Sequence, residues 1–277
     1  MKNASRIVFG GMFVVAVISW VSICTTGAAG QTAGNNAVYN SSGNCNSMSH
    51  CAGSSAFIDA SVFATFGGNF CGVLNGILSG SSYSYPSTGA VIDARGLPFT
   101  TPPTSMTCSS TQPSPWTGIT NPPPSTILLP AGTIGIPGTW VLPSNTRLIG
   151  EGDGIPPSSG AFPGTRIQLV SGNTVSSMIQ FGSSSSCSGG ISVERLTLDG
   201  QAQAIDGIVN QYCPGPSSVD HVTLFQILGT GLSVSANAND SGPYANIRFD
   251  TGGYSGTSST ACAQIKSNRT SSVRRPA

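Results

Sequence analysis

The C-terminal half of this chain carries most of the charged side chains that could do chemistry. Asp206, Asp220 and Lys266 are the candidate catalytic residues. Hydrolysis of a glycosidic bond usually needs two carboxylates, whereas elimination from a uronate needs a base and a group such as Ca²⁺ that neutralises the uronate carboxylate. Ca²⁺ is therefore the cofactor to expect if the reaction is an elimination. The sequence otherwise leaves the metal unknown.

Each candidate also has a structural interpretation. Asp199 and Asp206 each precede a glycine, a pattern typical of turns in which the Asp side chain bonds nearby backbone. Glu194 and Asp220 hold the same position of a repeat, so they form either a carboxylate ladder that binds a cation or solvated surface charge. His221 is expected on the exposed face of its strand, and Asp240, Asp250, Arg195 and Arg248 complete the set of candidates.

Three segments of this region repeat one pattern, and they lie at 193–198, 219–224 and 244–249. The offsets between them are 26 and 25 residues. Apolar residues hold the first, fourth and sixth positions of each segment, and the alternation marks a strand with one buried face. Repetition at about 20–50 residues favours a solenoid, whose coils bury their apolar faces against each other.

Composition limits the class of protein. Charged residues make up 8% of the 277 residues, and the formal net charge is +1. Nucleic-acid binding needs a clustered basic surface, so no nucleic-acid partner is expected. Beyond the N-terminus no apolar run approaches the ~20 residues of a membrane span. With 36 Gly and 19 Pro, the chain favours an all-β extracellular domain.

Residues 1–30 have the pattern of a secretory signal peptide. Lys2 and Arg6 precede the apolar segment 7–23, and small residues precede an expected cleavage near Gln31. The alternative is an uncleaved anchor helix, since the apolar segment is long for a signal. We therefore expect a secreted, cell-surface or periplasmic protein with no membrane partner after cleavage.

Seven cysteines follow the predicted signal, and an exported chain can pair them. One pair encloses a short polar loop, and another is 26 residues apart, about one coil. Connectivity cannot be proved from sequence. The expected pairs are Cys45–Cys51, Cys187–Cys213 and Cys71–Cys108. Cys262 is left over, and the rival interpretation, a zinc site, lacks any Cys-x-x-Cys spacing.

The remaining segments define the domain organisation. Residues 31–55 form a polar, disulfide-pinned leader, residues 56–268 form the main domain, and residues 269–277 form a basic disordered tail. The tail and the leftover Cys262 favour a chain truncated at the C-terminus over a natural short protein. An uncapped last coil predicts self-association.

Within the main domain, residues 69–78 place apolar side chains on one helical face, with Asn69 as the cap and Gly80 after the end. Such a helix would cover the edge of the first coil. Residues 89–94 are the expected first strand, and the Pro/Ser/Thr-rich segment 98–125 is expected to be an excursion loop. Further strands are expected at 127–129, 139–142, 146–149, 166–170, 178–181, 204–209, 231–235 and 262–266.

Several motifs resemble the pectate lyase superfamily from about residue 56 to residue 268. The residues that carry the resemblance are Leu129-Pro130-Ala131-Gly132-Thr133, Thr146-Arg147-Leu148-Ile149-Gly150-Glu151-Gly152 and Thr165-Arg166-Ile167. The preceding helix and segment 90–94 are similar too. The resemblance implies a right-handed parallel β-helix with an N-terminal capping helix. It does not fix the chemistry, because this fold serves lyases, hydrolases and adhesins.

The polygalacturonase branch of that group offers a closer comparison. Segment 229–234 is similar to its Gly-His-Gly motif and segment 264–266 to its Arg-Ile-Lys motif. However, Thr230 replaces the His, Gln264 replaces the Arg, and Asp206 stands alone where a pair of aspartates is expected. These departures remove an acid/base partner and one substrate-binding charge.

Two classes of function therefore remain open. The first is an exported enzyme, a lyase or hydrolase that binds and cleaves acidic polysaccharide. The second is a non-catalytic surface or adhesion module, or a truncated remnant without activity. Clustering of Asp206, Asp220 and Lys266 on one groove would favour the enzyme, and their separation would favour the module.

Overall fold

The computed structural model describes residues 56–63, 69–81, 85–97, 105–157, 162–183, 187–235, 238, 241–250 and 262–265. The predicted signal, the leader with Cys45 and Cys51, Lys266, Asp240 and the basic tail lie outside the described residues. No helix among the described residues is long and apolar enough to cross a membrane.

The described part of the chain is built almost entirely from short strands. One α-helix, α3 (Phe70–Leu78), and one 3-10 turn, η1 (Ala60–Phe63), accompany them. The strands are β1 (Ala56–Asp59), β2 (Ala90–Asp93), β3 (Ser105–Thr107), β4 (Ser125–Leu128), β5 (Gly132–Ile136), β6 (Trp140–Leu142), β7 (Thr146–Ile149), β8 (Thr165–Leu169), β9 (Val175–Phe181), β10 (Ser192–Asp199), β11 (Ala204–Asn210), β12 (Ser218–Phe225), β13 (Leu232–Val234), β14 (Tyr244–Asp250) and β15 (Ala263–Ile265).

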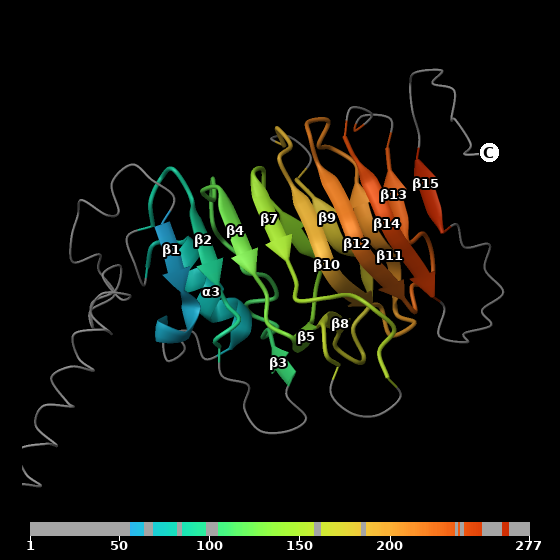
Figure 1. Cartoon of the computed structure of the whole chain (residues 1–277), viewed down its shortest axis with the longest axis horizontal. Coiled ribbons are helices and arrows are strands. Elements are labelled where there is room, and N and C mark those ends of the chain that lie inside the picture. Colours follow the sequence, from blue (N-terminus) through green and yellow to red (C-terminus); the bar gives the residue numbers. More distant parts are fainter. Residues whose placement is uncertain are drawn as a thin grey trace, which may run out of the picture.

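These strands form two sheets in which every pairing between named strands is parallel. The larger sheet has the order β1-β2-β4-β7-β10-β8-β5-β3, and β12 and β14 extend it from β10. The smaller sheet has the order β15-β13-β11-β9-β6. From β9 onward successive strands of the chain alternate between the two sheets, so the molecule grows along one direction as stacked coils (Figure 1). The all-β, solenoid-like architecture agrees with the repeat in the sequence.

The register of the three repeats is the one that their apolar positions predict. Leu196 pairs with Val222, which pairs with Ile247. The next inward row contains Leu198, Leu224 and Phe249. Leu196 and Val222 are fully buried, since each coil covers the apolar face of its neighbour.

Two details of the N-terminal part differ from the sequence prediction. The first described strand is β1, which pairs in parallel with β2, so β2 is not the beginning of the stack. The predicted excursion loop contains β3, which pairs with β5. Strand β1 ends at η1 after four residues, and β3 lies among Pro, Ser and Thr residues that indicate a loop, so neither was predicted.

The helix lies at the N-terminal end of the stack, as predicted. Asn69 accepts a hydrogen bond from the backbone N–H of Gly72 at 2.9 Å and so caps the first turn. The Phe70 ring lies 6.5 Å from the Trp140 ring and parallel to it, so the helix packs beside β6, the first strand of the smaller sheet. The helix also contacts η1 and β3.

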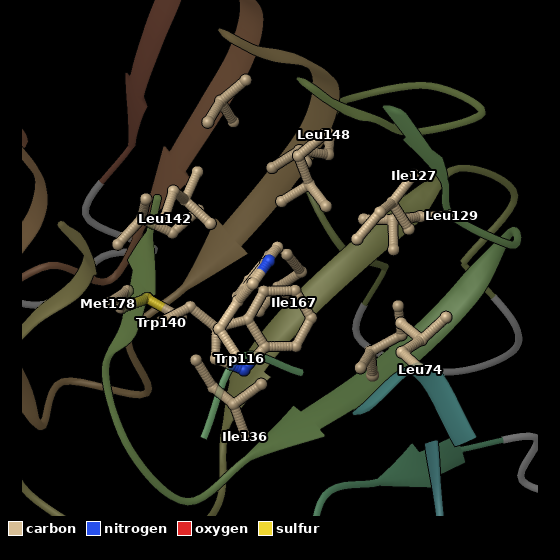
Figure 2. Close-up of a cluster of buried hydrophobic side chains, with 14 of the residues drawn as sticks. Leu74, Trp116, Ile127, Leu129, Ile136, Trp140, Leu142, Leu148, Ile167 and Met178 are labelled. Carbon is tan, nitrogen blue, oxygen red and sulfur yellow. The ribbon is translucent and has the colours of Figure 1, made fainter. Parts of the chain in front are cut away.

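The interior between the two sheets is apolar and continuous (Figure 2). Trp140 is fully buried, and Trp116 of the excursion loop lies edge-on to it at 6.0 Å. Trp116 thus folds back over the strands. Two disulfides join the loops to this frame, Cys71–Cys108 and Cys187–Cys213, and these are the expected pairs.

Strand β10 replaces two short strands of the preceding coil. Its first half pairs with β7 and its second half with β8. Between the halves the chain bends at Arg195, which has a φ of 57°. Gly150 of the preceding coil lies against this bend, where an added Cβ would stand 2.2 Å from the Arg195 carbonyl oxygen. Glycine is therefore required here for close backbone approach.

Substituting Gly150 by Ala should lower the free energy of unfolding by about 1–3 kcal/mol, because the added methyl group overlaps backbone that cannot move freely. Gly152 is the matched control, since an added Cβ there would meet only the Gly164 Cα at 3.7 Å. Denaturant unfolding of both variants measures the difference. Equal stabilities for the two variants would show that the bend does not need glycine at residue 150.

Candidate functional site

The outer face of the smaller sheet carries no charge along its central row. This row runs through Val141, Gln180, Val209, Ser233 and Gln264, one residue from each strand. The first four side chains are half-buried and the last is exposed. The row offers amide and hydroxyl groups but no side chain suited to acid–base chemistry.

Asp206 lies at the start of β11 in the smaller sheet. Its carboxylate accepts a hydrogen bond from the backbone N–H of Thr230 at 2.9 Å. The turn interpretation of Asp206 is therefore incorrect in detail, since this carboxylate holds the loop of the next coil and not its own turn. Thr230 is the residue that stands where the resemblance requires a histidine, so Asp206 meets a backbone amide and no proton-transfer partner.

Asp220 lies on β12 in the larger sheet, and the two described catalytic candidates therefore belong to different sheets. Lys266 follows β15 in the sequence and lies outside the described residues. Asp206 and Asp220 share no hydrogen-bond partner among the described residues. The arrangement does not bring these two carboxylates together as a pair.

The outer face of the larger sheet is charged. Arg147 contacts Glu194 at 3.0 Å, His221 contacts Asp220 at 3.0 Å, and Arg248 contacts Asp250 at 3.8 Å. The side chains of Arg147, His221 and Arg248 are all more than half exposed. Exposed ion pairs contribute little to stability, so these residues are available for contacts with a ligand.

The bend between the halves of β10, β12 and β14 forms a row of exposed residues, which we call the bend row. It consists of Arg195, His221 and Asn246, with φ of 57°, 51° and 51°. Left-handed backbone suits Gly and Asn but costs other residues about 1–2 kcal/mol. The Arg195 side chain makes no hydrogen bond or ion pair with any residue that the structure describes. Arg195 thus combines an exposed, unpaired guanidinium with a strained backbone, which makes it a candidate for ligand contact.

Asp220 is held beside the bend row by two hydrogen bonds. The Asn246 amide donates to it at 2.8 Å, and His221 lies 3.0 Å away. These contacts, the Asn246 bond first, hold the pKa of Asp220 below its ordinary value. Glu194 instead bonds Arg147 and Ser192. The two carboxylates therefore have separate partners, which supports paired surface charge over a shared cation site.

A loop covers the second half of the same face. Gly154 and Thr197 exchange two hydrogen bonds, of 3.0 Å and 2.8 Å, and the Thr223 hydroxyl donates to Asp153 at 2.9 Å. Thr197 and Thr223 are completely buried by this cover. Asp153 therefore has a structural role. The open part of the face is the bend row and the charges beside it.

Asp199 is the most deeply buried charged group in the described part of the chain. It is fully buried, and Arg166, 18% exposed, donates to it. Gln201 donates to it through both its backbone N–H and its side chain, each at 2.9 Å, and the backbone contact confirms the turn interpretation. The buried ion pair with Arg166 was not anticipated, because the partner lies 33 residues earlier and carries no motif that indicates burial.

No three His, Cys, Asp or Glu side chains are grouped as metal ligands among the residues that the structure describes. Comparisons with models of protein families, with curated proteins and with solved structures found no match. Fold and site are thus described from this chain alone. Arg147 and Arg166 are the site residues that sequence reasoning missed, although their alternation with apolar Leu148 and Ile167 indicated an outward direction.

Asp199→Asn should lower the free energy of unfolding by about 3 kcal/mol, because Arg166 would keep its charge in a largely buried position without a counter-ion. Asp220→Asn is the matched control and should have a much smaller effect, since its carboxylate is solvated. Thermal and denaturant unfolding compare the two. A loss for Asp220→Asn as large as that for Asp199→Asn would contradict the structural role given to Asp199.

Asn246→Gly should raise the pKa of Asp220 toward its ordinary value, because the strongest hydrogen bond to the carboxylate is removed while the left-handed backbone is kept. Because the pKa of Asp220 is lower in the folded state than in the unfolded state, the charged carboxylate stabilises the fold at pH values above the unfolded-state pKa. This contribution is lost as the pH falls through the folded-state pKa. An NMR titration of the Asp220 carboxyl carbon measures the shift. Gln226→Gly, at another left-handed position, is the control that should leave it unchanged.

Proposed function

We propose that this chain is an exported right-handed parallel β-helix protein that binds acidic polysaccharide on the outer face of its larger sheet. The parallel sheets, the repeat register and the N-terminal helix support the β-helix. The resemblance of residues 129–133, 148–152 and 165–167 to the pectate lyase superfamily supports the same fold. Two disulfides are consistent with export to an oxidising compartment.

The observation that carries the proposal is the state of Arg195. Its guanidinium is exposed and has no partner among the described residues. Its backbone is left-handed, whereas the equivalent position of β14 holds Asn246, a residue better suited to that conformation. A residue chosen for stability alone would be Asn or Gly. Retaining Arg at this position is explained if the cation contacts a ligand.

The stack gives this face a periodic arrangement. Adjacent strands lie about 4.8 Å apart, so residues at equivalent positions of successive coils recur at short, regular intervals. Arg147, Arg195 and Arg248 lie on three strands of this face, and the His221 imidazole lies on a fourth. A polymer with regularly repeated carboxylates can contact several of them together, and each contact adds to the affinity.

Binding explains the geometry better than cleavage does. Asp206 and Asp220 lie on different sheets, and the carboxylates near the bend row are already paired with cations or amides. Hydrolysis needs two carboxylates that flank one bond, an arrangement that these residues do not form. We therefore propose a binding module, and the same assay reveals any turnover.

Arg195→Asn should weaken binding to polygalacturonate roughly twofold to fivefold at low salt, because one solvated charge pair contributes up to about 1 kcal/mol. The same change should raise the free energy of unfolding by about 0.5–1 kcal/mol, because Asn tolerates the left-handed backbone. Affinity electrophoresis and denaturant unfolding measure the two effects. A substitution that weakens binding while it raises the free energy of unfolding is not expected if Arg195 has only a structural role.

Arg195→Lys is the matched control, since it keeps the charge and should keep most of the affinity. Added salt should weaken wild-type binding, because exposed charges are screened. Unchanged affinity in Arg195→Asn would overturn the proposed face. Release of unsaturated products or reducing ends by the wild-type chain would favour an enzyme and return attention to Asp206 and Lys266.

A further inference from the structure

A second surface is formed where the excursion loop meets the corners of two coils. A hollow of about 600 Å³ lies between them, which we call the corner hollow. Its walls include Trp116, Ile119, Asn121, Val141, Asn145 and Ser183. Its volume lies within the range of about 300–1,000 Å³ that is usual for ligand sites.

None of the described residues that line the corner hollow is charged. Four of the lining residues, Thr120, Asn121, Asn145 and Ser183, have exposed side chains that make no hydrogen bond with any described residue. Apolar surface from prolines and from Ile119 lies among them. Hydroxyl and amide groups beside small apolar patches match a ligand that has many hydroxyl groups and apolar C–H faces.

The walls of the hollow are held in place before any ligand binds. The Cys71–Cys108 disulfide ties the excursion loop to helix α3, and the Cys187–Cys213 disulfide ties the opposite corner to the next coil. Asn75 of the helix donates hydrogen bonds to the carbonyl oxygens of Pro115 and Thr117, at 3.0 Å and 2.9 Å. A preformed site loses little entropy on binding.

The length of the excursion loop also needs an explanation. The stack itself is continued by β4 to β6, so segment 108–124 adds little to the sheets beyond covering Trp140. The Trp140 indole N–H donates to the Pro113 carbonyl oxygen at 2.9 Å, which fixes the loop against the core (Figure 2 shows Trp116 beside Trp140). Long ordered loops of this kind are usually functional.

We infer that the corner hollow is a binding site for neutral saccharide. This inference does not depend on the proposed function, because the bend row and the corner hollow share no residue. The class of ligand follows from the uncharged lining, the unpaired hydroxyl and amide side chains and the rigid apolar patches. An acidic sugar would find no counter-charge among the described residues of this hollow.

The test compares binding of neutral cello-, xylo- and manno-oligosaccharides with binding of an oligogalacturonate, by calorimetry and by NMR of the full chain. At least one neutral oligosaccharide should bind. Ser183→Trp should weaken that binding tenfold or more, because the indole fills the hollow from an exposed position. Asn121→Gly with Asn145→Gly should weaken it about fivefold, since both side-chain amides are lost while the left-handed backbone is kept.

Gln226→Gly is the matched control, a side-chain deletion at a left-handed position outside the hollow, and it should bind like the wild type. If Ser183→Trp does not fold, the glycine pair still decides the question. Failure of every neutral oligosaccharide to bind, or unchanged binding in the glycine pair, overturns the inference. Binding of a proline-rich peptide in place of sugars also overturns it. Arg195→Asn should leave neutral saccharide binding unchanged, which separates this site from the bend row.

Discussion

No coil of this protein can bury its apolar face without the coils beside it. Leu196 and Val222 are fully buried only because strands on both sides of β10 and β12 hold their inward rows in the same register. A shift of one residue would exchange inward and outward side chains. The constraint that builds the core therefore also builds the surface, since it places the outward residues of successive coils in rows.

The bend between the two halves of each long strand follows from this stacking. The three long strands β10, β12 and β14 turn at the same position, so the left-handed conformation recurs at Arg195, His221 and Asn246. Gly150 allows the preceding coil to approach that bend closely. Side chains at the bend point outward and have few neighbours, which makes it a position where ligand contacts can be placed without disturbing the core. The cost is local backbone strain wherever the residue is neither Gly nor Asn.

Sequence patterns predicted the parts of the fold that depend on local periodicity. The long strands β10, β12 and β14 and the helix α3 were predicted because each has a full alternation or one apolar face with a cap. Strands β1, β3 and β5 were missed. Strand β1 ends at η1 after four residues, whereas β3 lies in the Pro/Ser/Thr-rich segment and β5 in the Leu-Pro-Ala-Gly-Thr motif, where these residues indicate a loop or turn.

The site was less predictable than the fold. Asp199 looked like an ordinary turn residue, and it does form that turn, but its burial depends on Arg166 and on neighbours that no local pattern specifies. Asp206 was predicted from a motif, yet its surroundings in space supply only a backbone amide. Identifying a charged residue is possible from sequence, whereas deciding whether it is buried, paired or free requires the contacts between coils.

A second hollow connects the corner hollow with Arg147, one of the charged residues of the larger sheet. This smaller hollow, of about 300 Å³, lies over the beginnings of β2, β4 and β7, with Arg147 on its edge. It shares Pro124 and Asn145 with the corner hollow, so the uncharged surface continues to the charged face. A polysaccharide with both acidic and neutral units that reaches both surfaces would bind more tightly than one that reaches either, because the second contact is intramolecular. Selectivity would then come from the order of the units along the polymer and from the fixed distance between the surfaces, which the disulfides and the stack hold constant.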